Sequence, residues 1–179
     1  MKNILKIAFC CMLTVGFQSC KNSKSLQKYI VEKSENPDFF SINISPKELL
    51  KSSIKQNENP LEGIENINVL VLKNSDFQKT NNEYHEIKTI LDDEKYQDLV
   101  RTNSKGNKFQ IDYIGSDDNI KEVIILVRQG QERLALLRVL TNGLTINQLL
   151  QLPEMLKDEN IDSENITKIV EKLSQAFKK

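Results

Sequence analysis

Apolar residues in the first part of the chain recur at two different spacings. Residues 26–30 carry apolar side chains three to four positions apart, which predicts a short helix that ends before Pro37. Apolar and polar residues alternate over residues 40–44, the pattern of a half-buried strand. Ser45 is followed by proline and, three residues after it, by glutamate, so it predicts the N-cap of a helix over residues 46–54.

The middle of the chain combines a continuous apolar run with helical spacing. Residues 67–72 are apolar almost without interruption, which predicts a strand that is covered or paired on both sides. Residues 77–91 show helical spacing and predict a long helix that breaks at residues 92–93. Tyr96, Leu99 and Val100 predict a short second helix that ends before the next glycine.

Three further strands are predicted close together, at residues 109–113, 123–127 and 134–140. The turns between them, at residues 115–119 and 129–131, are short enough to force antiparallel pairing. We expect both faces of this meander to be partly apolar. Ile111, Ile125 and Leu136 are expected on one face, opposite the set Ile114, Leu126, Ala135, Leu137 and Val139.

Two helices are predicted after the meander. Thr145 can cap the first of them, which Pro153 either kinks or ends. Ser163 can cap an amphipathic C-terminal helix that runs to Phe177. The whole pattern predicts an α+β fold with a single mixed sheet of about five strands, in which a βαβ unit precedes an antiparallel meander and the helices pack mainly on one side.

This order of elements resembles a known family. A strand that ends at residues 43–46, a strand at residues 69–72, a long helix and a closing meander are similar to an uncharacterised Bacteroidota lipoprotein family, catalogued as a domain of unknown function. The resemblance covers residues 26–152 and rests on patterns of apolar residues. It implies a small secreted α+β domain and carries no site residues over to this chain.

The N-terminus has the order of an export signal. Lys2 is followed by a mostly apolar run over residues 4–17 and then by Gln18, Ser19 and Cys20. The run is shorter than the roughly 20 apolar residues of a membrane-spanning helix, which is the main alternative. Cleavage by an ordinary signal peptidase fits less well, because Phe17 occupies a position that favours a small residue.

Ser19 and Cys20 instead resemble a lipobox, in which the cysteine receives diacylglycerol on its thiol and, after cleavage, an acyl chain on its amine. We therefore predict a lipoprotein signal peptide at residues 1–19, a short polar tether at 20–25 and one α+β domain at 26–179. Cys20 would then be the only cysteine of the mature chain, and the membrane would be bound through its lipid. The tether lacks the acidic run that in similar lipoproteins directs surface export, so we expect a periplasm-facing position in the cell envelope.

Charge and candidate chemistry change this interpretation little. The 25 basic residues balance the 25 acidic ones, so no net field attracts nucleic acid. His85 is the only histidine, and a solvated helix position accounts for it. A hairpin turn accounts for the acids at 117–118, and a helix start for those at 92–94. The sequence thus indicates no catalytic residue, metal ligand or cofactor.

Two classes of function remain open. The first is a non-enzymatic envelope protein that binds an unidentified partner protein or ligand through an uncovered sheet face or the C-terminal helix. The same face could instead be covered by the C-terminal helices. The alternative class is an envelope-acting hydrolase whose acidic site is assembled only by the fold, and it predicts His85 or clustered carboxylates inside a concave pocket.

Overall fold

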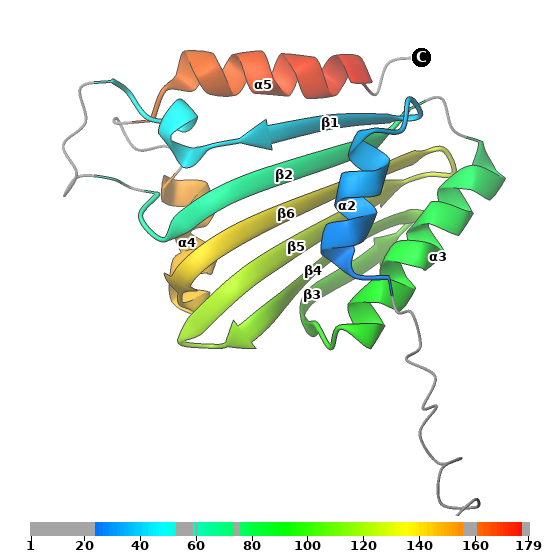
Figure 1. Ribbon diagram of the computed structural model, residues 1–179, viewed down its shortest axis with the longest axis horizontal. Coiled ribbons are helices and arrows are strands. Elements are labelled where there is room, and N and C mark those ends of the chain that lie inside the picture. The colour runs from blue at the N-terminus through cyan, green and yellow to red at the C-terminus, as the bar shows by residue number, and fades with distance from the viewer. Residues whose placement is uncertain (1–23, 53–58, 60, 74–75, 156–160, 177–179) are drawn as a thin grey trace, which may run out of the picture.

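The computed structural model describes residues 24–52, 59, 61–73, 76–155 and 161–176, which form one six-stranded sheet with helices around it (Figure 1). The strands are β1 (Phe39–Ile44), β2 (Ile64–Leu72), β3 (Gln97–Ser104), β4 (Asn107–Ser116), β5 (Asn119–Gln129) and β6 (Arg133–Leu144). The helices are α2 (Leu26–Ser34), α3 (Phe77–Asp93), α4 (Ile146–Met155), α5 (Ser163–Ala176) and the 3-10 helix η1 (Pro46–Leu49). None of the helices in these residues is both long and apolar enough to cross a membrane.

The strands lie in the order β1-β2-β6-β5-β4-β3, and each neighbouring pair is antiparallel. The predicted meander over β4, β5 and β6 is confirmed. The prediction of a mixed sheet is wrong. The predicted βαβ unit requires its two strands, β1 and β2, to run parallel, but they are direct neighbours and pair antiparallel.

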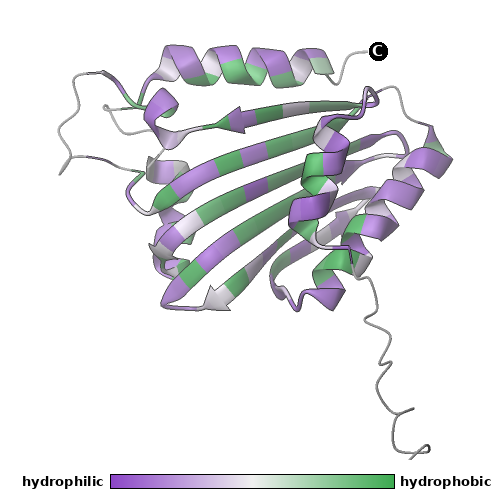
Figure 2. Ribbon diagram, viewed as in Figure 1, coloured by the Kyte–Doolittle hydropathy of each residue, from purple (hydrophilic) through white to green (hydrophobic). Residues whose placement is uncertain are grey.

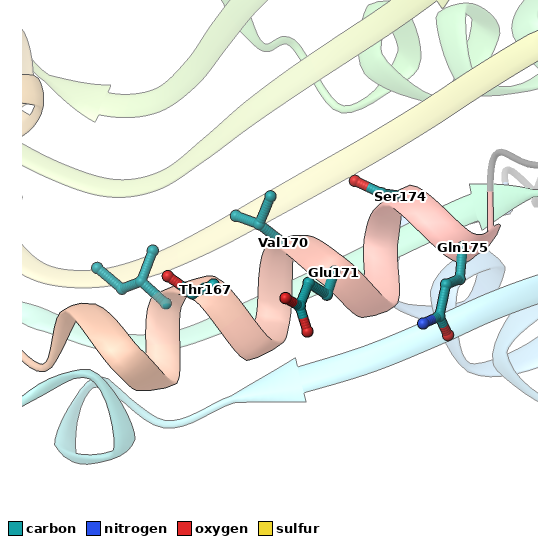
Figure 3. A pocket seen from close by; sticks show the side chains of 6 residues that line it. Thr167, Val170, Glu171, Ser174 and Gln175 are labelled. Atoms are coloured by element: carbon teal, nitrogen blue, oxygen red, sulfur yellow. The ribbon is translucent and has the colours of Figure 1, made fainter.

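Helices cover both faces of the sheet, so the expectation that they pack mainly on one side is also wrong. Alternate residues of a strand point to opposite faces. Leu70 of β2 packs with α2 and α3, whereas its neighbours Val69 and Val71 pack with α5. Helix α4 packs against Val123 on the same side as α5. Figure 2 shows the hydrophobic residues that recur along the strands, and Figure 3 shows α5 beside β1.

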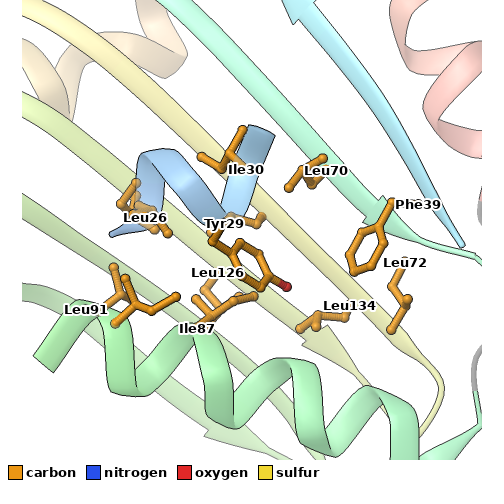
Figure 4. Close-up of a cluster of buried hydrophobic side chains, with 13 residues drawn as sticks. Leu26, Tyr29, Ile30, Phe39, Leu70, Leu72, Ile87, Leu91, Leu126 and Leu134 are labelled. Carbon is orange, nitrogen blue, oxygen red and sulfur yellow. The ribbon is translucent and has the colours of Figure 1, made fainter. Parts of the chain in front are cut away.

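The largest cluster of buried apolar side chains lies between the sheet and helices α2 and α3 (Figure 4). Tyr29 comes from α2, Ile87 and Leu91 from α3, and Leu126 and Leu134 from the strands; each is almost fully buried. Burying one such side chain contributes about 1.5–3 kcal/mol. The two helices are therefore integral parts of the core.

Strand β3 is the element that the sequence pattern predicts wrongly, as a short helix. Its pairing with β4 is irregular between Asp98 and Val100, so Leu99 is an extra residue that interrupts the alternation of faces. Helix α3 ends where Lys95 adopts a left-handed backbone conformation, with φ 61°. Lys105 and Gly106 also have positive φ and form the tight turn that returns the chain into β4. This edge strand is the sixth strand, one more than predicted.

Helix starts are predicted with mixed success. The helix predicted from Ser45 is reduced to the 3-10 helix η1, and the side chain of Ser45 makes no capping hydrogen bond. Leu50, which directly follows η1, forms an isolated bridge with Ile161. Residues 53–58, where that helix would have ended, lie outside the described residues. The Thr145 cap is confirmed, because its Oγ1 accepts a hydrogen bond from the backbone N–H of Gln148 at 3.2 Å.

The first residue of the last helix is Ser163, but the cap is the residue before it. The side chain of Asp162 accepts a hydrogen bond from the backbone N–H of Asn165 at 3.0 Å. Helix α4 continues past Pro153 to Met155.

Candidate functional site

Six partly exposed apolar side chains form the most extended candidate surface, on the side of the sheet opposite α2 and α3. Strand register places them in two adjacent rows across β6, β5 and β4. One row is Ala135, Val127 and Phe109, and the other is Leu137, Ile125 and Ile111. Side chains directly opposite on neighbouring strands lie about 4.5–5.5 Å apart at Cβ, so the six make one continuous surface, which we call the open sheet face.

The ends of the same rows show how far the helices cover this side. Val71 and Val69 of β2 continue the two rows and are buried under α5. Val123 lies in the next row and is fully buried under α4. The open sheet face is thus the gap that α4 and α5 leave between them. The sequence left open whether this face is uncovered or is covered by the C-terminal helices. In the structure α4 and α5 cover part of it and leave part accessible.

The predicted grouping is wrong for the residues of β6. Ala135, Leu137 and Val139 share the face of Ile111 and Ile125, and Leu136 lies on the opposite face. Ile125 pairs with Leu137 and with Ile111, so these three share a face, although Leu137 was expected opposite the other two. Leu126 and Leu136 pair with each other on the α2–α3 side. A shift of one residue in the register of a strand moves all of its side chains to the opposite face of the sheet. The sequence pattern alone does not fix that register.

Helix α5 borders the open sheet face, packs on it through Ile166, Ile169, Leu173 and Ala176, and is joined to η1 by hydrogen bonds at its N-terminal end. The backbone N–H of Asp162 donates to Leu49 O at 2.8 Å, and the side-chain amide of Asn165 donates to Glu48 O at 3.0 Å. No residue of α5 is fully buried, and Val170 is 52% exposed. A shallow cavity of about 270 Å³ lies against the helix, lined among others by Val170 and Ser174, which project away from β1 (Figure 3).

A polar network on the other side of the sheet joins α2 to α3. Lys33 Nζ lies 2.6 Å from Glu83 Oε1, and the Tyr29 hydroxyl donates to Glu83 Oε2 at 2.7 Å. Burial raises the pKa of Tyr29, and its hydrogen bond to Glu83 raises it further. Lys24 lies 2.8 Å from Glu86. The network therefore fixes the first residues of the domain on α3.

A buried ion pair lies beneath the same helices. Arg138 on β6 makes two hydrogen bonds of 2.9 Å to the carboxylate of Glu122 on β5. The hydroxyl of Tyr96 donates to the same carboxylate, and Arg138 also donates to the side chain of Gln27 on α2. Burial raises the pKa of Tyr96, and its hydrogen bond to Glu122 adds to the rise. All four groups hold one another in place, which is a structural role.

Neither Glu122 nor Arg138 is among the candidate residues predicted from the sequence. The available signal is that Glu122 directly precedes the apolar residues 123–127 and that Arg138 stands inside the apolar stretch 134–140. Charged residues at such positions are paired when they are buried.

The sequence candidates for chemistry lie apart from one another. His85 is exposed on α3, where its ring lies 5.7 Å from that of Tyr84. Asp117 and Asp118 form the turn between β4 and β5, as predicted, and Asp117 accepts a hydrogen bond from the hydroxyl of Tyr113 at 2.7 Å. The part of the chain that the structure describes contains no group of three or more metal-ligating side chains.

The acids at residues 92–94 are not at a helix start, as the sequence suggested, but at the C-terminal end of α3. Glu94 there accepts a hydrogen bond from the backbone N–H of Leu26 at 2.9 Å, at the first residue of α2. Negative charge at this end gains nothing from the helix dipole, so the contact with α2 accounts for Glu94 better. Cys20 lies outside the described residues.

Comparison with known proteins places this sheet in a recognised family. Residues 29–152 match DUF4252, a domain of unknown function, and the chain belongs to that family. The match begins within α2 and ends within α4, so it contains the whole sheet and leaves out α5. It confirms the resemblance to a domain of unknown function. No curated protein and no solved structure matches the chain.

Proposed function

We propose that this chain is a lipid-anchored protein of the cell envelope, held by acyl chains on Cys20, whose domain binds a partner protein through the open sheet face. One observation carries the binding part of the proposal. Six apolar side chains in two contiguous rows remain partly exposed between α4 and α5. Contiguous apolar surface of a few hundred Å² on a monomer commonly marks a contact site.

The anchor rests on the sequence pattern around Ser19 and Cys20 and on the distance to the domain. Lys24 is the fourth residue after Cys20, and its ammonium group is paired with Glu86 and Glu32. Four extended residues reach at most about 14 Å. An acylated Cys20 would therefore hold the start of α2 close to the lipid headgroups.

This geometry leaves the open sheet face accessible. Helix α2, which continues from the tether, packs on one side of the sheet, and the open sheet face lies on the other side. The six side chains of the face carry no charge, which suits a protein surface with apolar side chains at its centre. The alternative, a hydrolase, depended most on His85, and that residue is exposed on α3.

The anchor is tested by palmitate labelling and intact mass of the protein in the membrane fraction, with Cys20→Ser as the comparison. We expect labelled wild-type protein to lack residues 1–19, and the variant to lose the label and to move to the soluble fraction. Unlabelled wild-type protein that retains its first nineteen residues would refute the anchor and favour a membrane-spanning signal.

The open sheet face is tested by site-specific photocrosslinking in cells. A crosslinking residue at Val127 should give an adduct of discrete mass, and the same residue at Lys28, exposed on α2, should not. Ile125→Lys places a charge in the second row, next to Val127 on the same strand face, and should abolish the adduct while circular dichroism shows a folded domain. An adduct at Val127 that survives Ile125→Lys would count against the proposal, as would no adduct at all.

A further inference from the structure

A second candidate site lies on the α2–α3 side of the sheet, near the β3 edge. It is a cavity of about 230 Å³ between α3 and strands β3 to β5. Its lining includes Tyr84, Arg101, Asn103, Lys108, Gln110 and Leu126. The volume is below the roughly 300–1,000 Å³ of pockets for drug-sized ligands, so a compact ligand is the class that fits.

Strand register explains why these side chains face the same cavity. Arg101 on β3 pairs with Gln110 on β4, which in turn pairs with Leu126 on β5. In the adjacent row, Asn103 pairs with Lys108, and Lys108 pairs with Arg128. Two neighbouring rows on one face thus bring three cationic side chains within reach of the ring of Tyr84, which covers them from α3.

Arg128 is a buried cation whose contacts are neutral. It is only 6% exposed, and its guanidinium lies 5.6 Å from the ring centroids of both Phe77 and Tyr84. It donates hydrogen bonds to Asn81 Oδ1 at 3.2 Å and to Gly130 O at 3.3 Å. Two aromatic rings and two carbonyl oxygens surround this charge, so it raises the positive potential near the cavity without pointing into open space.

Lys108 is the cation best placed for a ligand. Its ammonium lies 4.7 Å from the ring centroid of Tyr84 and forms none of the ion pairs found among the described residues. Arg101 is already paired with Asp98 at 3.0 Å. About one positive charge that faces the cavity therefore lacks a carboxylate, which matches a ligand with a single negative charge.

We propose that this cavity binds a small organic carboxylate, with its charged end at Lys108 and Arg101 and its apolar part against Tyr84 and Leu126. The side-chain amide of Asn103 borders the same space and can donate to the carboxylate, whereas the Nε2 of Gln110 already donates to Asp112. Phe109 at the β4 edge borders both sites, but the cationic side chains of the cavity lie on the side of the sheet opposite the open sheet face. The proposal does not depend on the proposed partner protein.

The probe for the experiment is benzoate, which combines one carboxylate with a compact apolar ring. The full chain in a nonionic detergent is titrated at constant ionic strength, and binding is followed by the rise in melting temperature and by NMR shifts of the Asn103 and Gln110 amides. We expect saturable binding that Lys108→Gln weakens about tenfold, the size of effect given by a lost charged hydrogen bond. Arg101→Gln, at a half-exposed position, should weaken it in the same direction.

Lys121→Gln is the matched control, since Lys121 is exposed on β5 outside the cavity lining, and it should leave binding unchanged. Inorganic phosphate should bind more weakly than benzoate, because a dianion exceeds the available positive charge and does not fill the apolar end. The proposal is overturned if benzoate gives no saturable response, if Lys108→Gln and Arg101→Gln bind benzoate as wild type does, or if phosphate binds more tightly.

Discussion

Replacement of Arg138 by methionine should be among the most destabilising single changes in this domain. The side chains of Arg138 and Glu122 are only 10% and 11% exposed, and two hydrogen bonds of 2.9 Å join them. Arg138→Met leaves the carboxylate of Glu122 buried with the hydroxyl of Tyr96 as its remaining partner. Removing one member of a buried ion pair typically costs about 3–5 kcal/mol, a large part of the roughly 5–15 kcal/mol that stabilises a domain.

The double variant Glu122→Leu with Arg138→Met separates the ion pair from the packing around it. Two apolar side chains of similar volume leave no buried charge, so most of the loss should be recovered. A residual cost of about 1 kcal/mol is expected, because Tyr96 and Gln27 each lose a hydrogen-bond partner. The free energy of unfolding is measured by urea denaturation followed by circular dichroism for the wild type, both single variants and the double variant.

Lys168→Met is the control, since Lys168 pairs with Glu164 on the exposed side of α5, and it should leave the unfolding free energy unchanged within error. The reasoning is refuted if Arg138→Met costs less than about 1 kcal/mol, because the charge would then be hydrated or dispensable. It is equally refuted if the double variant loses as much as the sum of the two single variants.

Three further predictions can be checked by the same unfolding measurements. Gly115→Ala should cost about 2 kcal/mol or more, since φ is 126° and the new Cβ would lie 2.3 Å from a backbone oxygen, whereas Gly130→Ala, with open space around it, should cost less. Burial raises the pKa of Asp112 above its usual 3.8, so its ionisation opposes folding; Asp112→Asn should be at least as stable as wild type at pH 7, and the difference should shrink as the pH falls through that pKa. Leu91→Ala should cost about 2–5 kcal/mol and Ile169→Ala about 1 kcal/mol, because only the first is fully buried; equal losses would contradict the weak packing of α5.

The elements predicted correctly from the sequence are those with unambiguous local patterns. Residues 123–127 are apolar at every position and have a tight turn on either side, so a strand is the only simple interpretation. Helix α3 carries apolar residues at helical spacing over more than four turns, and Asp76 caps it. Local pattern and tertiary structure agree in both cases.

The sheet order could not be read in the same way, because it depends on contacts between distant residues. Strand β6 inserts between β5 and β2, where Leu70 pairs with Leu136, a contact across 66 positions of sequence. Strand β3 has few apolar residues because it is an edge strand, and the extra residue at Leu99 removes the remaining alternation. The candidate surfaces depend on these same features: register defines the open sheet face, and β3 supplies Arg101 and Asn103 to the cavity.

The position of α5 outside the family match bears on the extent of the binding surface. Val69 and Val71 continue the two rows of the open sheet face, and α5 packs over them although none of its own residues is fully buried. Without α5, the apolar rows would extend across β2 toward Phe40 and Ile42 of β1. The segment after the family domain therefore sets how wide the open sheet face is in this chain. A partner that displaced α5 would contact the residues of β1 and β2 that α5 now covers, and only the partly buried contacts of α5 would be lost.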